Sequence, residues 1–263
     1  MNRIDRIARL WRTVRHLRRT QVYGRLRSRL VRPKLDLAPA PPARVVKGRW
    51  VQPAPRAKSL VGPTRFRFLN RDEELDDIGW DDPRLPKLWR YNQHYFDDLN
   101  AEDWRSRSEW HSALIARWIR ENEAAKGTGW EPYPTSLRIV NWIKWSLSGG
   151  VLTPAAHLSL AVQVRWLGQR LEWHLLGNHL FANAKALAFA GLYFEGSEAE
   201  KWRHQAIKIL ADELDEQFLG DGGQFELSTM YHALGLEDLL DLINIGNAYP
   251  HVFPECMHRR LRE

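Results

Sequence analysis

Apolar residues recur at three- and four-residue spacings from about residue 104 onward, which predicts a series of helices. Glycine or proline separates most of these stretches. The expected helices are Ser106–Ala125, Thr135–Leu147, Pro154–Leu176, Gly177–Leu192, Ser197–Phe218 and Ser228–Tyr249, with a seventh opening at Pro254. No alternating strand pattern lies between them. The pattern therefore predicts an all-α fold of antiparallel helical hairpins, arranged as a toroid or a solenoid.

Local signals predict how two of these helices begin. Thr153 before Pro154 is typical of an N-cap followed by proline at the first helical position. Ser197 with Glu200 fits a capping box for the fifth helix.

The N-terminal quarter of the chain has a different pattern. Residues 2–31 place apolar residues at helical spacing among many arginines, which predicts a basic amphipathic helix within a segment 1–32. Such a helix could lie on an anionic membrane surface or pack on the protein body, and the sequence leaves both open. Residues 33–64 hold seven prolines and predict an extended linker or a wrapping strap. The helical domain is expected over residues 65–263.

Charge is divided unevenly between these segments. Residues 1–67 contain 19 Lys and Arg against 2 Asp and Glu, so the remainder carries a balance of −10 although the whole chain is at +7. The basic character belongs to the N-terminal segment, and we predict no nucleic-acid partner. No run of 18 apolar residues predicts a membrane span, and the N-terminus has no readable signal peptide.

Thirteen tryptophans in 263 residues are more informative than the charge. Flat aromatic faces stack on sugar rings, so a Trp-rich chain with a polar cleft indicates a carbohydrate ligand. Aromatic side chains also fill cores, and we expect more than half of these tryptophans to be buried.

Asn178 and His179 form the first polar interruption of the helical pattern, directly after Gly177. A helix start attracts anions, and an amide beside an imidazole can neutralise a substrate carboxylate. One preorganised donor can be worth roughly 3 to 4 kcal/mol to a developing oxyanion. The alternative is structural, because asparagine is also a good N-cap.

Tyr231 and His232 form the second interruption, shortly after Glu226. A phenol can take and return a proton, so Tyr231 is a candidate acid and base. A free tyrosine has a pKa near 10, and ionising it at pH 7 costs roughly 4 kcal/mol, so a cation or proton acceptor such as His232 or Arg138 is needed. The alternative is a tyrosine packed at a helix end.

The segment Gly129–Arg138 combines aromatic, acidic and basic residues before a helix. We predict that it contacts substrate, with Trp130 stacking on a pyranose and Arg138 pairing with a carboxylate or sulfate. Its other candidate contacts are Glu131 and Tyr133. The alternative is that Thr135 caps the helix and the aromatic residues seal the core. A second lining segment includes Asn92 and His94.

Other chemistries find less support in the sequence. Ten histidines and one cysteine show no metal-ligand spacing, so we predict no metal and no cofactor. Glu131, Asp221 and Glu226 could supply the carboxylate pair of a glycoside hydrolase, which is the enzymatic alternative.

The order of these motifs resembles the helical domain of the heparinase II/III family of polysaccharide lyases. The resemblance covers roughly residues 65–263 and depends on four motifs, which are moderately specific singly and fairly specific in this order. They are Trp89-Arg90-Tyr91-Asn92-Gln93-His94-Tyr95-Phe96, Gly129-Trp130-Glu131-Pro132-Tyr133-Pro134, Gly177-Asn178-His179-Leu180, and Phe225-Glu226 with Ser228 and Tyr231-His232.

The resemblance implies an incomplete (α/α) toroid followed by a β-sandwich, with β-elimination at a uronic acid between them. It implies that Asn178 neutralises the uronate, that His179 stands beside it as in alginate-cleaving relatives, and that Tyr231 is the catalytic tyrosine. It also implies an anionic polysaccharide substrate, no cofactor and a periplasmic or cell-envelope location. Without a readable signal peptide, the cytoplasm or the inner-membrane surface is the alternative.

The chain stops before any strand-rich segment, so we expect it to be truncated, and inactive alone. The non-enzymatic alternative is a carbohydrate-binding or membrane-peripheral module of exopolysaccharide assembly.

Overall fold

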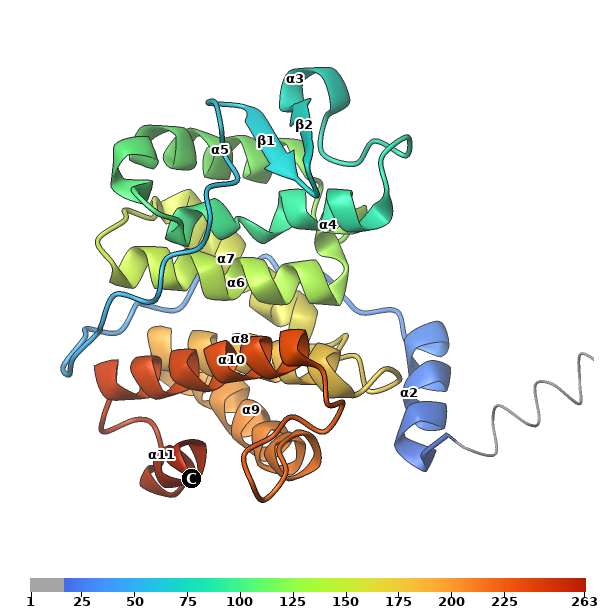
Figure 1. Ribbon diagram of the computed structural model, residues 1–263, viewed down its shortest axis with the longest axis vertical. Coiled ribbons are helices and arrows are strands. Elements are labelled where there is room, and N and C mark those ends of the chain that lie inside the picture. The colour runs from blue at the N-terminus through green and yellow to red at the C-terminus, as the bar shows by residue number, and fades with distance from the viewer. Residues whose placement is uncertain (1–16) are drawn as a thin grey trace, which may run out of the picture.

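Helices dominate the computed structural model, which describes residues 17–263 (Figure 1). The helices in chain order are α2 (Arg19–Leu30), α3 (Leu75–Ile78), α4 (Lys87–Tyr95), α5 (Ser108–Glu121), α6 (Pro132–Leu147), α7 (Pro154–Gly168), α8 (Gly177–Tyr193), α9 (Gly196–Gln217), α10 (Thr229–Ala248) and α11 (Glu255–Arg262). Short 3-10 turns cover Asp97–Asn100, Trp104–Arg107 and Thr128–Trp130. The expected all-α fold of helical hairpins is confirmed.

One antiparallel hairpin, β1 (Arg65–Phe68) with β2 (Arg71–Glu74), makes up the sheet structure of residues 17–263. Phe66 and Phe68 face the core, and Arg65 and Arg67 face solvent. The sequence pattern does not predict this hairpin, because four residues per strand are too few for a clear alternation.

Helix α8 lies at the centre of the helical stack. Every residue from Leu180 to Tyr193 in it is buried. A helix that is buried on all sides needs partners on all sides, and α8 packs on α6, α7, α9 and α10. In Figure 1, α6 separates α8 and α10 from α4 and α5.

Two helix starts differ in how well the sequence predicts them. The Thr153 cap is confirmed, since its hydroxyl accepts a hydrogen bond from the Ala156 amide at 3.2 Å. The capping box at Ser197 is wrong, because α9 starts at Gly196 and has no side-chain cap. Helix α7 ends at Gly168, earlier than the predicted Leu176, and residues 169–176 form a loop instead.

The proline-rich residues 33–64 are extended and lie on the helices. Their backbone amides donate to carbonyls at the end of α8 and α10, as from Arg44 to Tyr193 at 2.6 Å and from Gly48 to Ala248 at 3.0 Å. Further along, the Arg56 amide donates to Asn100 at 3.0 Å. The segment therefore connects helices that are far apart in the chain.

The predicted basic helix over residues 2–31 falls partly outside the described residues, which begin at 17. Its described part, α2, packs on the loop 169–176 through Gly24. A Cβ at Gly24 would lie 2.9 Å from the His174 backbone nitrogen, so the two backbones are in close contact. Among residues 17–263, no helix is both long and apolar enough to cross a membrane.

Tryptophan fills much of the core, as expected. Trp118 contacts Trp130 with ring centroids 5.7 Å apart and Trp142 at 5.9 Å. The buried tryptophans of residues 17–263 are Trp80, Trp89, Trp104, Trp118, Trp130, Trp142, Trp145, Trp166 and Trp202. The tryptophan content is thus mainly structural.

Candidate functional site

The start of α8 presents Asn178 to a pocket. Leu176 and Gly177 both have positive φ, 61° and 57°, which turns the chain sharply into the helix. Leu176 is the N-cap and Asn178 the second helical residue, so the alternative that Asn178 caps the helix is wrong. The Asn178 side-chain amide makes no hydrogen bond within residues 17–263 and lines a cavity of about 410 Å³.

This cavity, which we call the Asn178 pocket, brings Asn178 next to the segment before α10, while Tyr231 and His232 are not among its lining residues. His179 lines it beside Asn178, and Phe225 and Glu226 line it from the segment before α10. The two segments are more than 45 residues apart in sequence. Phe225 is among the exposed large apolar residues and offers an aromatic face at the pocket.

The imidazole of His179 is held by a carboxylate that the sequence analysis did not select. Its Nδ1 lies 3.2 Å from Oε1 of Glu172. Glu172 is in turn fixed by Asn183, whose amide donates to Oε2 at 3.1 Å while its oxygen accepts from the Glu172 backbone nitrogen at 2.8 Å. A carboxylate accepts from Nδ1–H, which leaves Nε2 of His179 available to a ligand. The sequence pattern does not single out Glu172, because its segment is predicted as part of a helix. The signal that could have indicated it is an acidic residue between two large apolar residues, Leu171 and Trp173.

Tyr133 packs against His179, with ring centroids 4.5 Å apart. Burial, with the negative charges of Asp238, Asp97 and Glu172 nearby, raises the pKa of Tyr133 to about 12. Tyr133 therefore stays neutral at physiological pH and can donate a hydrogen bond.

Tyr231 lies in the first turn of α10, where the Ser228 hydroxyl caps the helix. It is close enough to Tyr133 to contribute to the raised pKa of that residue. Tyr231 is half-buried and His232 is exposed. No hydrogen bond of residues 17–263 joins the Tyr231 side chain to Asn178 or His179.

Trp130 does not contribute to this site, and the prediction that it stacks on a sugar is wrong. It is 4% exposed and packs on Trp118, and its carbonyl accepts from Trp166 Nε1 at 3.0 Å. Both faces of the Trp130 ring therefore lie in the core.

Arg138 and His94 are also buried, at 0% exposure, so their predicted contacts with substrate are wrong. Arg138 donates to Gln163 at 2.8 Å and lies over the Trp118 ring at 3.9 Å. His94 accepts from Trp118 Nε1 at 3.0 Å, and burial lowers its pKa to about 3. Both side chains make hydrogen bonds within an aromatic core. Arg138 therefore cannot be the cation that eases ionisation of Tyr231.

Glu131 and Glu226 line different cavities. Glu131 accepts from Lys87 Nζ at 2.8 Å and from the Tyr91 hydroxyl, and it lines a groove of about 940 Å³ beside α2. Glu226 lines the Asn178 pocket. A hydrolase needs two carboxylates that flank one bond, whereas Glu131 and Glu226 line different cavities.

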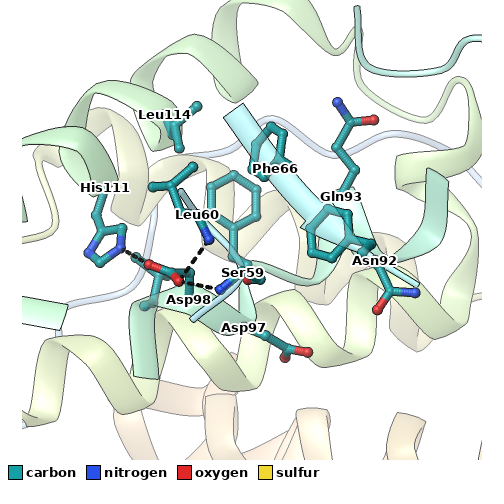
Figure 2. Close-up of a pocket in the computed structure, with 12 residues that line it drawn as sticks. Ser59, Leu60, Phe66, Asn92, Gln93, Asp97, Asp98, His111 and Leu114 are labelled. Atoms are coloured by element: carbon teal, nitrogen blue, oxygen red, sulfur yellow. Dashed lines mark hydrogen bonds and ion pairs between the residues drawn. The ribbon is translucent and has the colours of Figure 1, made fainter. Parts of the chain in front are cut away.

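Asn92 is also separated from the Asn178 pocket. It lines a small cavity of about 20 Å³ with Ser59 and Leu60, where Asp98 accepts from both of their backbone amides and contacts His111 (Figure 2). That volume holds about one water molecule. The Asn92 amide donates to Leu88 at 2.7 Å.

The stacked hairpins form an incomplete (α/α) toroid, and comparison with known proteins places it in a family. Residues 100–262 match the family model described as Heparinase II/III N-terminus, so the chain belongs to this family. A heparin-sulfate lyase of Bacteroides stercoris is 39% identical over 74 residues, 28% of this chain and 11% of that protein. A heparin-sulfate lyase of Pedobacter heparinus is 29% identical over 161 residues, 55% of this chain and 24% of that protein.

Solved structures show the same fold. A mutant of the heparan sulfate lyase HepC from Pedobacter heparinus aligns with a TM-score of 0.53 at 20% identity, covering 92% of this chain and 42% of that one. A heparinase III with methylated lysines aligns with a TM-score of 0.52 at 21% identity, covering 71% and 35%. This chain therefore corresponds to the helical part of longer relatives and is a polysaccharide-lyase-related module.

Proposed function

We propose that this chain forms the helical wall of a polysaccharide lyase site that cleaves a uronic-acid-containing glycan by β-elimination. The main support is the Asn178 pocket, where an amide without a hydrogen-bond partner and an oriented imidazole line the same cavity. The Asn178 amide donates to a carboxylate, and His179 does so through Nε2 as an imidazolium whose Nδ1–H stays on Glu172. Both residues stand at a helix start, where an anion is favoured.

In the proposed reaction, Asn178 and His179 bind the uronate carboxylate and stabilise the negative charge that develops on it. The C5–H bond then breaks and its proton passes to the Tyr231 phenolate. The electron pair forms the C4=C5 double bond as the C4–O bond breaks. The departing oxygen takes a proton from the tyrosine, so that Tyr231 ends as it began.

Neighbouring groups complete this assignment. Tyr133 stays neutral beside His179 and is suited to donate to a substrate oxygen. His232 follows Tyr231 and is the nearest imidazole in sequence, so it is our candidate for easing ionisation of the phenol. A periplasmic or cell-envelope location is proposed from the family resemblance alone.

The test is the ultraviolet absorbance of the conjugated double bond that elimination creates in the product. The chain and the longest natural polypeptide that contains it are incubated with heparan sulfate, alginate and a neutral glycan. Elimination from an anionic polymer supports the proposal. Saturated reducing ends would indicate a hydrolase, and tight binding without any bond cleavage would indicate the non-catalytic module.

Two substitutions assign the roles. Tyr231→Phe and Asn178→Ala are each expected to lower turnover about 100-fold or more, since general acid–base catalysis and a preorganised donor each contribute at least that much. Tyr249→Phe is the matched control, because Tyr249 ends the same helix and its buried hydroxyl makes no hydrogen bond within residues 17–263. Full activity of Tyr231→Phe would show that another group is the base.

A further inference from the structure

The groove of about 940 Å³ beside α2, which we call the Arg27 groove, adjoins the candidate site. His179 and Leu175 line both this groove and the Asn178 pocket. One wall comes from α2 and the residues after it, including Arg27 and Arg32, and the floor comes from the loop 169–175. A glycan bound at His179 would therefore continue along α2.

The acidic groups of the Arg27 groove are already engaged. Glu131 is paired with Lys87 at 2.8 Å and accepts from Tyr91. Glu172 is occupied by His179 and Asn183. Neither carboxylate is left to neutralise the remaining cations of the groove.

Three guanidinium groups have no such partner. Arg27, Arg32 and Arg170 line the groove and make no ion pair with a carboxylate of residues 17–263. Arg170 lies over the Trp166 ring at 5.1 Å, an arrangement that leaves its donors available. Guanidinium groups bind carboxylate and sulfate oxygens in a two-point fork, which makes three of them in one groove suited to an anionic sugar chain.

We propose that the Arg27 groove is a subsite for the anionic substituents, carboxylate or sulfate, of sugar residues that flank the one bound at His179. The inference rests on the proposed function for the position of the glycan. It gives α2 a role in binding substrate, and it makes docking of α2 through Gly24 a condition for tight binding.

An anionic membrane is the competing ligand for the same helix. Tyr23, Leu26 and Leu30 are exposed on α2 and could enter a lipid surface. The groove favours the glycan because Arg27 and Arg32 line a cavity shared with the protein body, where a bilayer cannot follow.

The first test removes the charges. The triple variant Arg27→Gln/Arg32→Gln/Arg170→Gln is titrated with size-defined heparan sulfate and alginate oligosaccharides by calorimetry. We expect affinity for at least one of them to fall by 100-fold or more, since a charge-assisted pair is worth about tenfold. A loss with heparan sulfate alone assigns the groove to sulfate, and a loss with both assigns it to carboxylate.

A matched triple variant controls for net charge. Arg19, Arg49 and Arg262 are exposed, make no side-chain ion pair within residues 17–263 and lie outside the groove. Replacing them with glutamine removes the same three charges and is expected to change affinity less than threefold. Equal losses in the two triple variants would overturn the proposal, because the effect would then be one of overall charge.

The second test displaces α2 and keeps every charge. Gly24→Leu places a side chain against the backbone of Trp173 and His174, so the helix must move away. We expect affinity to fall as far as in the arginine variant. Unchanged glycan affinity in Gly24→Leu would overturn the proposal. The proposal would also be overturned if the triple arginine variant kept its glycan affinity but lost binding to phosphatidylserine vesicles.

The two proposals fail in different ways. If the arginine variant binds glycan normally while Asn178→Ala abolishes elimination, the Arg27 groove is not a subsite and the lyase assignment stands. If the arginine variant loses affinity while the saturated wild type shows no elimination, the subsite stands and the lyase assignment falls.

Discussion

Lys185 of α8 and Asp238 of α10 form an ion pair at 2.7 Å, and each lies seven residues after a candidate catalytic residue of its own helix. Asn178 precedes Lys185 and Tyr231 precedes Asp238. Seven residues are about two helical turns, so each pair shares one helix face. The ion pair therefore fixes the two helices along their axes and sets where Asn178 stands relative to Tyr231.

A third helix joins the same cluster. Asp241 accepts from Lys185 at 2.6 Å and from Lys144 of α6 at 2.9 Å. Lys185 and Lys144 lower the pKa of Asp241 against the opposing effect of burial. The cluster connects α6, α8 and α10 through charged groups that are buried between them.

Lys185→Met should therefore destabilise the protein strongly. Two carboxylates, Asp238 and Asp241, would lose their shared cation, and breaking a buried pair in this way costs about 3–5 kcal/mol of unfolding free energy. Urea denaturation followed by circular dichroism measures it. Lys126→Met is the control, because Lys126 pairs with Glu123 on the surface and should cost less than about 1 kcal/mol. Similar urea midpoints for Lys185→Met and Lys126→Met would contradict the role of the buried ion pair in holding α8 against α10.

Acidic pH should weaken the fold through His94. Its folded pKa is about 3 and an unfolded histidine has one near 6.5, so the unfolded state binds the proton more readily. Its contribution is fully present above pH 6.5 and is lost at up to about 1.4 kcal/mol per pH unit as pH falls toward 3. The slope of unfolding free energy against pH should flatten in His94→Gln. The exposed His204→Gln should keep the wild-type slope, and an equal slope in all three proteins would refute the assignment.

Glu213 should act in the opposite direction. Burial raises its pKa to about 7, with Glu216 and Asp212 adding to the rise, and Gln217 and Arg18 opposing it. The folded state holds the proton more tightly, so stability is lost as pH rises from about 4.5 through 7. Glu213→Gln should therefore raise the unfolding free energy by about 1–3 kcal/mol at pH 8 and have little effect at pH 4.

Glu200→Gln serves as the control for this prediction, since Glu200 is exposed on the same helix. Thermal unfolding at the two pH values makes the comparison. A Glu213→Gln variant that gains nothing at pH 8 would contradict the raised pKa.

Trp130 and Phe225 should separate stability from binding. Trp130→Phe removes part of a buried ring system and should lower the unfolding free energy by about 1–3 kcal/mol without changing glycan affinity. Phe225→Ala should weaken glycan binding severalfold and leave the melting temperature nearly unchanged, because Phe225 lines the Asn178 pocket. Calorimetric titration and thermal unfolding of both variants test this, and a large affinity loss in Trp130→Phe would restore the sugar-stacking role.

Local features of the amino-acid sequence are enough to predict the series of helices and the polar segments between them. Helical periodicity and the Thr153 cap are local properties, readable within one or two turns. The same local pattern placed Asn178 and His179 at a helix start, and the structure has them there.

Which polar and aromatic residues face a ligand depends on how the helices pack against one another. Trp130, Arg138 and His94 are buried because α4, α5 and α6 close over them, and nothing in their own segments reports that packing. The pairing of His179 with Glu172 and the ion pair of Lys185 with Asp238 depend on elements that meet in space. Burial and charge pairing depend on contacts between distant segments, whereas helical periodicity is set by neighbours a few residues away.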